Sequence, residues 1–463
     1  MDDLLGLALS PIVSCAAPVS RPLASSANSP LQKYSADRIQ LPIVLDFQSD
    51  KGREEIREWY HKQPTTGFTH IEHRKETTGR FGHEFVVIRL VNSTACRFDR
   101  RAREDMRGHA LKDEGTISED SAHVITQADT ESKARLDESE VLLSTNLVWG
   151  KDINLEFILA MCCEIQSHPA AKSYSLLHYN CYFFSWTLVT IIDHQARQQR
   201  VRKSYSIKLS ADDWIAGFYD LLSQEMVVFG LHWQKESLWK RVTRLGQSII
   251  GANSHQRSLI LRVDKFIHEG MKRELGDHFS KRLDINLNKL LFPSQIPSWL
   301  NKQVSSALQE GGRLGVQQFL AETNAHSQIN NKLSAPIHPR KVDSGEERLD
   351  GSASSVVDVG HIYQSLDERA RWKAETEWKR YEKIIDTFIA NSSKLKMWSN
   401  ACWPPSNVVH KHVTERMGDH FKQTEGYGFG KAEPSIERAK DSMAEIWVSI
   451  LDMMEDKSEL SFL

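Results

Sequence analysis

The most informative segment of the chain is YSLLHYNCYFFSWTLVTIID, residues 174–193. After Asn180 the segment becomes mainly apolar, and Cys181 is its first residue. This apolar run suits a buried helix of about three turns, and it falls short of the roughly 18–20 apolar residues that cross a bilayer. A cysteine at a helix N-terminus feels the positive end of the helix dipole and unpaired backbone N–H groups, which favour thiolate over thiol. The segment therefore predicts a core helix that begins with a reactive cysteine.

A nucleophilic cysteine needs a base, and His83 is the candidate upstream. Period-two alternation predicts a β-meander before the helix, made of FTHIEHR (68–74), HEFVVIRL (83–90) and TACRFDRR (94–101). His83 begins the second of these strands. A histidine on a strand edge that faces a helix-borne cysteine is the arrangement of papain-type dyads. Asp99, on the following strand, is a polar residue that can orient the imidazole ring.

A plainer interpretation stands beside this one. A cysteine in an apolar helix is often only a small buried hydrophobic residue, and a histidine at a strand edge is often only a hydrogen-bonding residue. The chain has 19 His and six Cys, so some pairing of the two types can always be composed. The dyad predicts that the Cys181 sulfur lies within about 3–5 Å of the His83 ring.

YSLLHYNCYFFS (174–185) resembles the signature of PPPDE peptidases, the permuted papain-fold class that includes deSUMOylating isopeptidases. That class shows Tyr-x-Leu and then Asn-Cys-Asn-x-Phe-Ser on entering a helix. The matching residues here are Tyr174, Leu176, Asn180, Cys181, Phe184 and Ser185, with Tyr182 in place of the second Asn. The related lecithin retinol acyltransferase-like class also begins a helix with Asn-Cys-x-x-Phe. In both classes the catalytic His precedes the Cys, as His83 precedes Cys181.

The resemblance covers about residues 65–195 and implies a circularly permuted papain-like fold. It implies Cys181 as the nucleophile and His83 as the base, so the candidate catalytic residues are Cys181, His83, Asp99 and Asn180. The strand here reads Gly-His-Glu-Phe, which departs from the usual His-Thr or His-Ser of the family. The acyltransferase class carries a second His about a strand away, and His70 or His73 can take that part.

The whole chain predicts an α+β protein in which a small antiparallel sheet is followed by a mostly helical C-terminal extension. Helical patterns cover 51–61, 154–165, 362–398 and 434–454. The expected divisions are a flexible arm at 1–40, the papain-like domain at 41–200, a helical extension at 201–325, a disordered linker at 326–360 and a helical segment at 361–463.

A short heptad seam runs through 362–398, which favours a coiled-coil partner or packing within the chain. Its residues are Ala374, Trp378, Tyr381, Ile385 and Phe388.

Residues 97–140 hold 20 charged side chains among 44. That density predicts an exposed excursion from the sheet, in which His109 and His123 are solvated loop residues. On the preceding strands we expect an exposed acidic face, made of Glu72, Glu76 and Glu84.

Composition bounds the partners and cofactors. Lys+Arg 59 against Asp+Glu 61 gives a net charge of -2 over 463 residues, which disfavours a dedicated nucleic-acid binder. Six cysteines without a CxxC pair favour neither a disulfide scaffold nor a zinc site, and we expect no cofactor. The N-terminal apolar stretch carries Asp2 and Asp3 where a secretory signal is positive. We therefore expect a cytoplasmic or nuclear protein with no transmembrane segment.

The leading hypothesis is a cysteine-dependent hydrolase that cleaves an amide or isopeptide bond through a thioester intermediate. Its substrate would be a protein or an acylated molecule. Two alternatives stay open. The same dyad serves acyltransferases and lipid or ester hydrolases, which differ in the acceptor and the pocket. A catalytically inactive papain-like scaffold would keep the fold and bind partners through its helices.

Overall fold

A computed structural model describes residues 42–77, 82–103, 106, 109–110, 115–147, 153–203, 215–222, 254–281, 289–333, 359–404 and 407–455. Contacts group the chain into two compact units. The first unit comprises Met1–Lys208, Asn288–Pro293 and Trp398–Leu463, and the second comprises Leu209–Leu287 and Ser294–Met397. The protein is α+β, with an antiparallel sheet and helices in the N-terminal region and a mostly helical C-terminal region, as the sequence predicts.

The first unit is built on an antiparallel sheet. Its described strands are β1 (Ile43–Val44), β2 (Phe68–Lys75), β3 (Glu84–Leu90), β4 (Ala95–Ala102), β5 (Thr116–Ile125), β6 (Glu140–Asn146) and β7 (Ser173–Tyr174). They lie in the order β1-β5-β4-β3-β2-β6, and β7 pairs with β5. The expected meander is confirmed, because β2, β3 and β4 pair in succession. The β3–β4 register sets Val86 opposite Phe98.

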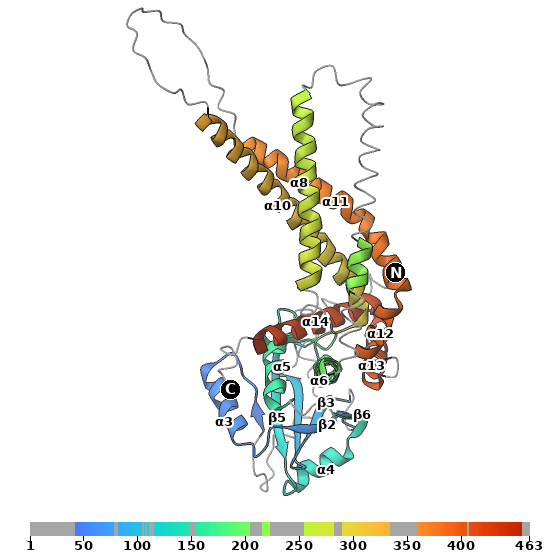
Figure 1. The fold of residues 1–463 in the computed structure, drawn as a ribbon. Coiled ribbons are helices and arrows are strands. Elements are labelled where there is room, and N and C mark those ends of the chain that lie inside the picture. The colour runs from blue at the N-terminus through green and yellow to red at the C-terminus, as the bar shows by residue number, and fades with distance from the viewer. Residues whose placement is uncertain are drawn as a thin grey trace, which may run out of the picture. The chain divides into compact units, whose positions relative to one another are not determined.

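Helices cover both faces of this sheet. The described helices of the first unit are α3 (Asp50–His61), α4 (Thr130–Glu138), α5 (Leu155–Ser167), α6 (Cys181–Lys203), α13 (Val408–Gly426) and α14 (Ala432–Glu455). Helices α5, α6, α13 and α14 share one core with the strands. Figure 1 shows α14 across α5 and α6, and α4 beyond the strands, where Leu136 packs with Phe85 and Val87.

The core is closed by helices that are distant in the sequence. Val86 and Phe98 of the sheet are buried in the same cluster as Leu188 of α6, Met417 of α13 and Trp447 of α14. The helices expected at 51–61, 154–165 and 434–454 are confirmed as α3, α5 and α14. Helix α6 has 23 residues, which is longer than the expected three turns.

The expected exposed excursion at 97–140 is wrong. Strand β4 lies between β3 and β5 in the interior of the sheet. Arg100 and Asp120 face each other in the β4–β5 register, both are fully buried, and Arg100 Nε lies 3.1 Å from Asp120 Oδ1. Because opposite charges on neighbouring strands neutralise each other, a dense mixture of charges does not require exposure.

The second unit is described as helices α8 (Ser254–Lys281), α10 (Ile296–Leu333) and α11 (Val359–Asn391), with the short η3 (Pro293–Gln295) and α12 (Ser393–Cys402) at its boundaries. Figure 1 shows α8, α10 and α11 side by side. Glycines let α8 and α10 approach closely, because a Cβ on Gly315 would lie 2.3 Å from the Phe266 carbonyl oxygen.

The expected 362–398 helix is divided, since α11 ends at Asn391 and α12 begins at Ser393. Of its seam, Ala374, Tyr381 and Ile385 are buried, and Trp378 and Phe388 are half-buried. The expected linker at 326–360 is helical at 326–333 and 359–360, and its remainder lies outside the described residues, as does the expected arm at 1–40.

Candidate active site

Asn180 fixes the point where α6 begins. Its Oδ1 accepts hydrogen bonds from the backbone N–H groups of Tyr182, at 2.9 Å, and Phe183, at 3.1 Å. Its Nδ2 donates to the Leu176 carbonyl at 2.8 Å. The side chain therefore caps the helix and also holds the loop before Cys181. This arrangement gives Asn180 a structural role and leaves Cys181 in the first turn.

His83 and Cys181 come together at this helix terminus. The Cys181 thiol is close enough to the His83 imidazole for its charge to raise the pKa of His83, and His83 Nε2 lies 3.3 Å from Asp99 Oδ1. His83 immediately precedes β3, and Gly82 before it has a φ of 51°, a left-handed conformation that suits glycine. The structure thus brings together the Cys, His and Asp that the sequence proposed.

Asp99 is held as a carboxylate by two neighbouring arginines. Arg101 Nε lies 2.6 Å from Asp99 Oδ1, and Arg97 Nε lies 3.0 Å from Asp99 Oδ2. Burial alone raises the pKa of Asp99, but the charges of Arg101 and Arg97, with the hydrogen bond from His83, hold that pKa well below its usual range. The carboxylate therefore stays charged behind the imidazole.

The environment of His83 favours its charged form. Burial alone lowers the pKa of His83, whereas the charge of a Cys181 thiolate and the hydrogen bonds with Asp99 and Cys181 raise it, to about 9. Phe85 stacks on the imidazole with ring centroids 6.3 Å apart, and the Arg97 guanidinium lies 3.7 Å from the centre of the Phe85 ring. The arrangement favours a charged imidazole at neutral pH.

Tyr174 is a further side chain at the cysteine. It lies on β7 and is buried. Burial and then the charge of Cys181 raise the pKa of Tyr174 well above its usual value, so its hydroxyl keeps its proton. In the sequence, Tyr174 stands out only as the first residue of the Tyr-x-Leu motif. That motif is the one local feature that points to Tyr174 as part of the site.

Other histidines proposed from the sequence lie elsewhere. His73 is fully buried against Glu84 and His412, and His70 Nδ1 lies 2.9 Å from the Thr69 hydroxyl. His109 is half-buried. The expectation that His123 is solvated is wrong, because it is buried on β5 with Nε2 3.5 Å from Asp129 Oδ2.

The expected exposed acidic face is also wrong. Glu84 is fully buried and pairs with His73 and Arg416. Glu72 pairs with Arg74 and Arg89, and Glu76 pairs with Arg97. Each of these carboxylates is paired with an arginine. The arginines lie on the strands of the sheet, except Arg416, which lies on α13.

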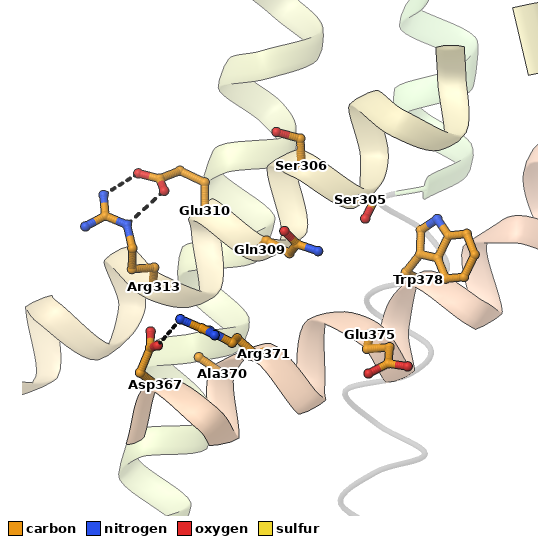
Figure 2. A pocket seen from close by; sticks show the side chains of 10 residues that line it. All are labelled: Ser305, Ser306, Gln309, Glu310, Arg313, Asp367, Ala370, Arg371, Glu375 and Trp378. Atoms are coloured by element: carbon orange, nitrogen blue, oxygen red, sulfur yellow. Dashed lines mark hydrogen bonds and ion pairs between the residues drawn. The ribbon is translucent and has the colours of Figure 1, made fainter. Parts of the chain in front are cut away.

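A hollow of about 700 Å³ lies in the second unit between α10 and α11 (Figure 2). Its charged side chains pair along their own helices: Arg313 Nε with Glu310 at 2.8 Å, and Arg371 with Asp367 at 2.9 Å. Figure 2 shows both pairs among the side chains that line the hollow. Because these charges are matched to each other, the arrangement indicates no chemistry, and the Cys181 region is the candidate active site.

Within the described ranges, no cluster of three or more His, Cys, Asp or Glu side chains is arranged to hold a metal ion. None of the helices in the described part of the chain is long and apolar enough to cross a membrane. In comparisons with models of protein families, with curated proteins and with solved structures, no match was found.

Proposed function

We propose that residues 41–200 form a circularly permuted papain-like thiol hydrolase that cleaves an amide or isopeptide bond. Cys181 is its nucleophile and His83 its base. The proposal rests on one observation above the others: Cys181, at the N-terminus of α6, raises the pKa of an imidazole that has a carboxylate 3.3 Å behind it. The resemblance of residues 174–185 to the permuted papain-fold signature supports the same reading.

In the proposed first half-reaction, His83 holds the proton of Cys181 and the thiolate attacks the substrate carbonyl carbon. The carbonyl electron pair moves to oxygen. The N–H groups of Tyr182 and Phe183 already donate to Asn180, so we assign the oxyanion to the Cys181 backbone N–H and the Tyr174 hydroxyl. Collapse of the intermediate breaks the C–N bond, and the His83 imidazolium gives its proton to the departing amine.

In the second half-reaction, water attacks the thioester carbonyl while His83 takes one of its protons. The carboxylic acid leaves, its C–S bond breaks, and the thiolate–imidazolium pair is restored. Asp99 does not exchange a proton in this scheme. It keeps the imidazole oriented and stabilises its charge, and Arg97 and Arg101 keep Asp99 ionised.

The test is covalent labelling followed by turnover. An acyl electrophile incubated with the full chain should modify the Cys181 peptide, as read by mass spectrometry, and His83→Asn should suppress that modification. Hydrolysis of a ubiquitin-like isopeptide, a peptide amide and an acyl ester is then measured in parallel. Turnover of the ester alone would favour the acyltransferase or lipid-hydrolase alternative. If Cys181 is not labelled and none of the three substrates is hydrolysed, the remaining alternative is a catalytically inactive scaffold.

A further inference from the structure

We propose that α13 is a positioning element of the active site, in which one polar stripe of the helix sets the geometry between Cys181 and His83. The inference rests on the proposed function. The polar stripe consists of His412, Arg416 and His420, which recur at every fourth residue and therefore lie on one face of the helix. The adjacent stripe of Val409, Val413, Met417 and Phe421 is buried in the core and fixes that face.

Arg416 contacts the strand that carries the base. It forms an ion pair with Glu84, which is fully buried and directly follows His83 in the chain. Glu84 Oε2 also lies 2.9 Å from His73 Nε2, and His73 Nδ1 lies 2.9 Å from His412 Nε2. The first residue of β3 is therefore tied to α13 directly through Arg416 and again through the two histidines.

His420 contacts the segment that carries the nucleophile. Its Nε2 donates to the carbonyl oxygen of Leu177 at 3.3 Å, in the loop that ends at Cys181. Its ring lies edge-on to the ring of Tyr182, the residue that follows Cys181, with the two ring centroids 5.1 Å apart. Burial lowers the pKa of His420 to about 4, so the ring is neutral at pH 7 and can keep its proton on Nε2.

One helix face thus contacts the chain on both sides of the dyad. Arg416 and His420 are one helical turn apart. A rigid helix therefore sets the distance between the first residue of β3 and the loop before Cys181. Catalytic geometry is sensitive to displacements of this kind, because a shift of about 1 Å can cost on the order of 100-fold in rate. A helix that served only to close the core would need Met417 and Phe421 but not the polar stripe.

The experiment compares paired variants of the full chain. Arg416→Gln removes the ion pair, and Arg416→Lys keeps a cation there. His420→Phe keeps the ring but removes the donor to Leu177, and His420→Gln keeps a donor. Lys422→Gln, at an exposed position on the same helix, is the matched control. Two rates are measured from pH 5 to pH 10: alkylation of the Cys181 peptide by iodoacetamide, and substrate hydrolysis. Thermal unfolding of every variant is recorded.

Arg416→Gln and His420→Phe should each lower hydrolysis on the order of 10–100-fold and shift the pH profile of Cys181 alkylation upward. Arg416→Lys and His420→Gln should recover most of the rate, and Lys422→Gln should match the wild type. If Arg416→Gln does not fold, the result for His420→Phe tests the inference, because this variant leaves the ion pair between Glu84 and Arg416 in place. Profiles and rates equal to those of Lys422→Gln in a reactive enzyme would overturn the inference while the proposed function stands. An inert Cys181 in the wild type would overturn both.

Discussion

His83 Nε2 lies 3.3 Å from Asp99 Oδ1, and both side chains are more than nine-tenths buried. A buried imidazole ordinarily loses its proton, because desolvation disfavours the charged form. Here the carboxylate and the adjacent Cys181 reverse that tendency and raise the pKa of His83 to about 9. The predictions below on Cys181, His83 and Asp99 follow from this reversal.

Substitutions in the dyad should remove turnover in a graded order. Cys181→Ser and His83→Asn should each lower hydrolysis on the order of 10²–10⁴-fold, since a hydroxyl is a poorer nucleophile and the proton for the leaving group is lost. Asp99→Asn should cost less, together with a lower melting temperature, because Arg97 and Arg101 lose a charged partner. Cys162→Ala, at a fully buried thiol, is the control, and steady-state kinetics with thermal unfolding checks the order. Equal rates for Cys181→Ser and the wild type would refute the assignment.

Removing one hydroxyl tests the assigned oxyanion donor. Tyr174→Phe keeps the ring that packs on Ala102 and Ala110, so folding should be unchanged. The loss should appear in kcat, on the order of 10²-fold, with little change in KM. Tyr179→Phe is the matched control, because the Tyr179 hydroxyl bonds Ser442 at 3.1 Å. A comparable loss of kcat in both variants would show that the effect is not specific to the cysteine.

Mild acid should destabilise the first unit. Burial and the charge of Arg416 lower the pKa of His73 to about 3, below the ordinary value of about 6.5. As the pH falls below about 6.5, His73 therefore binds a proton in the unfolded chain but stays neutral in the native state. The stability from His73 is present above about pH 6.5 and is lost as pH falls towards 3, by about 1.4 kcal/mol per pH unit.

Urea unfolding of the wild type and of His73→Gln at pH 7 and pH 5 checks this. The difference in stability between the two pH values should be smaller in the variant. An identical acid loss in both proteins would exclude His73 as a source.

The close crossing of α8 and α10 should not tolerate a methyl group. A Cβ on Gly315 would meet the Phe266 carbonyl oxygen at 2.3 Å, and backbone cannot move aside as a flexible side chain can. Gly315→Ala should therefore destabilise the second unit by about 1–3 kcal/mol. Gly217→Ala is the control, because nothing lies within 4 Å of its Cβ position and alanine suits a helix better than glycine. Differential scanning calorimetry should show a lower transition for Gly315→Ala only.

The sequence predicted the parts of the site that local pattern determines. Asn180 and Cys181 follow from one helix start, and His83 and Asp99 follow from alternation on adjacent strands. The buried charges could not be predicted in the same way, because the pairing of Arg100 with Asp120 depends on a strand register that composition does not reveal.

The helix α13 was missed for a related reason. His412, Arg416 and His420 have the spacing of any polar helix face, and nothing local indicates that this face returns to β3 and the Cys181 loop. A contact between Glu84 and Arg416 joins residues more than three hundred positions apart. Such pairs are set by how the whole core closes, so only the folded chain reveals them.

The pH dependence of Cys181 alkylation, in the wild type and in His83→Asn, tests directly whether His83 acts on Cys181. An ordinary cysteine, with a pKa of about 8.5, is only about 1% thiolate at pH 6.5. Since the pKa of His83 is raised to about 9, the imidazolium persists below that pH and is lost above it. Wild-type Cys181 should therefore alkylate at pH 6.5 on the order of 10–100 times faster than in His83→Asn. Two profiles that superimpose, both rising only near pH 8.5 or above, would contradict the account and leave Cys181 as a core thiol.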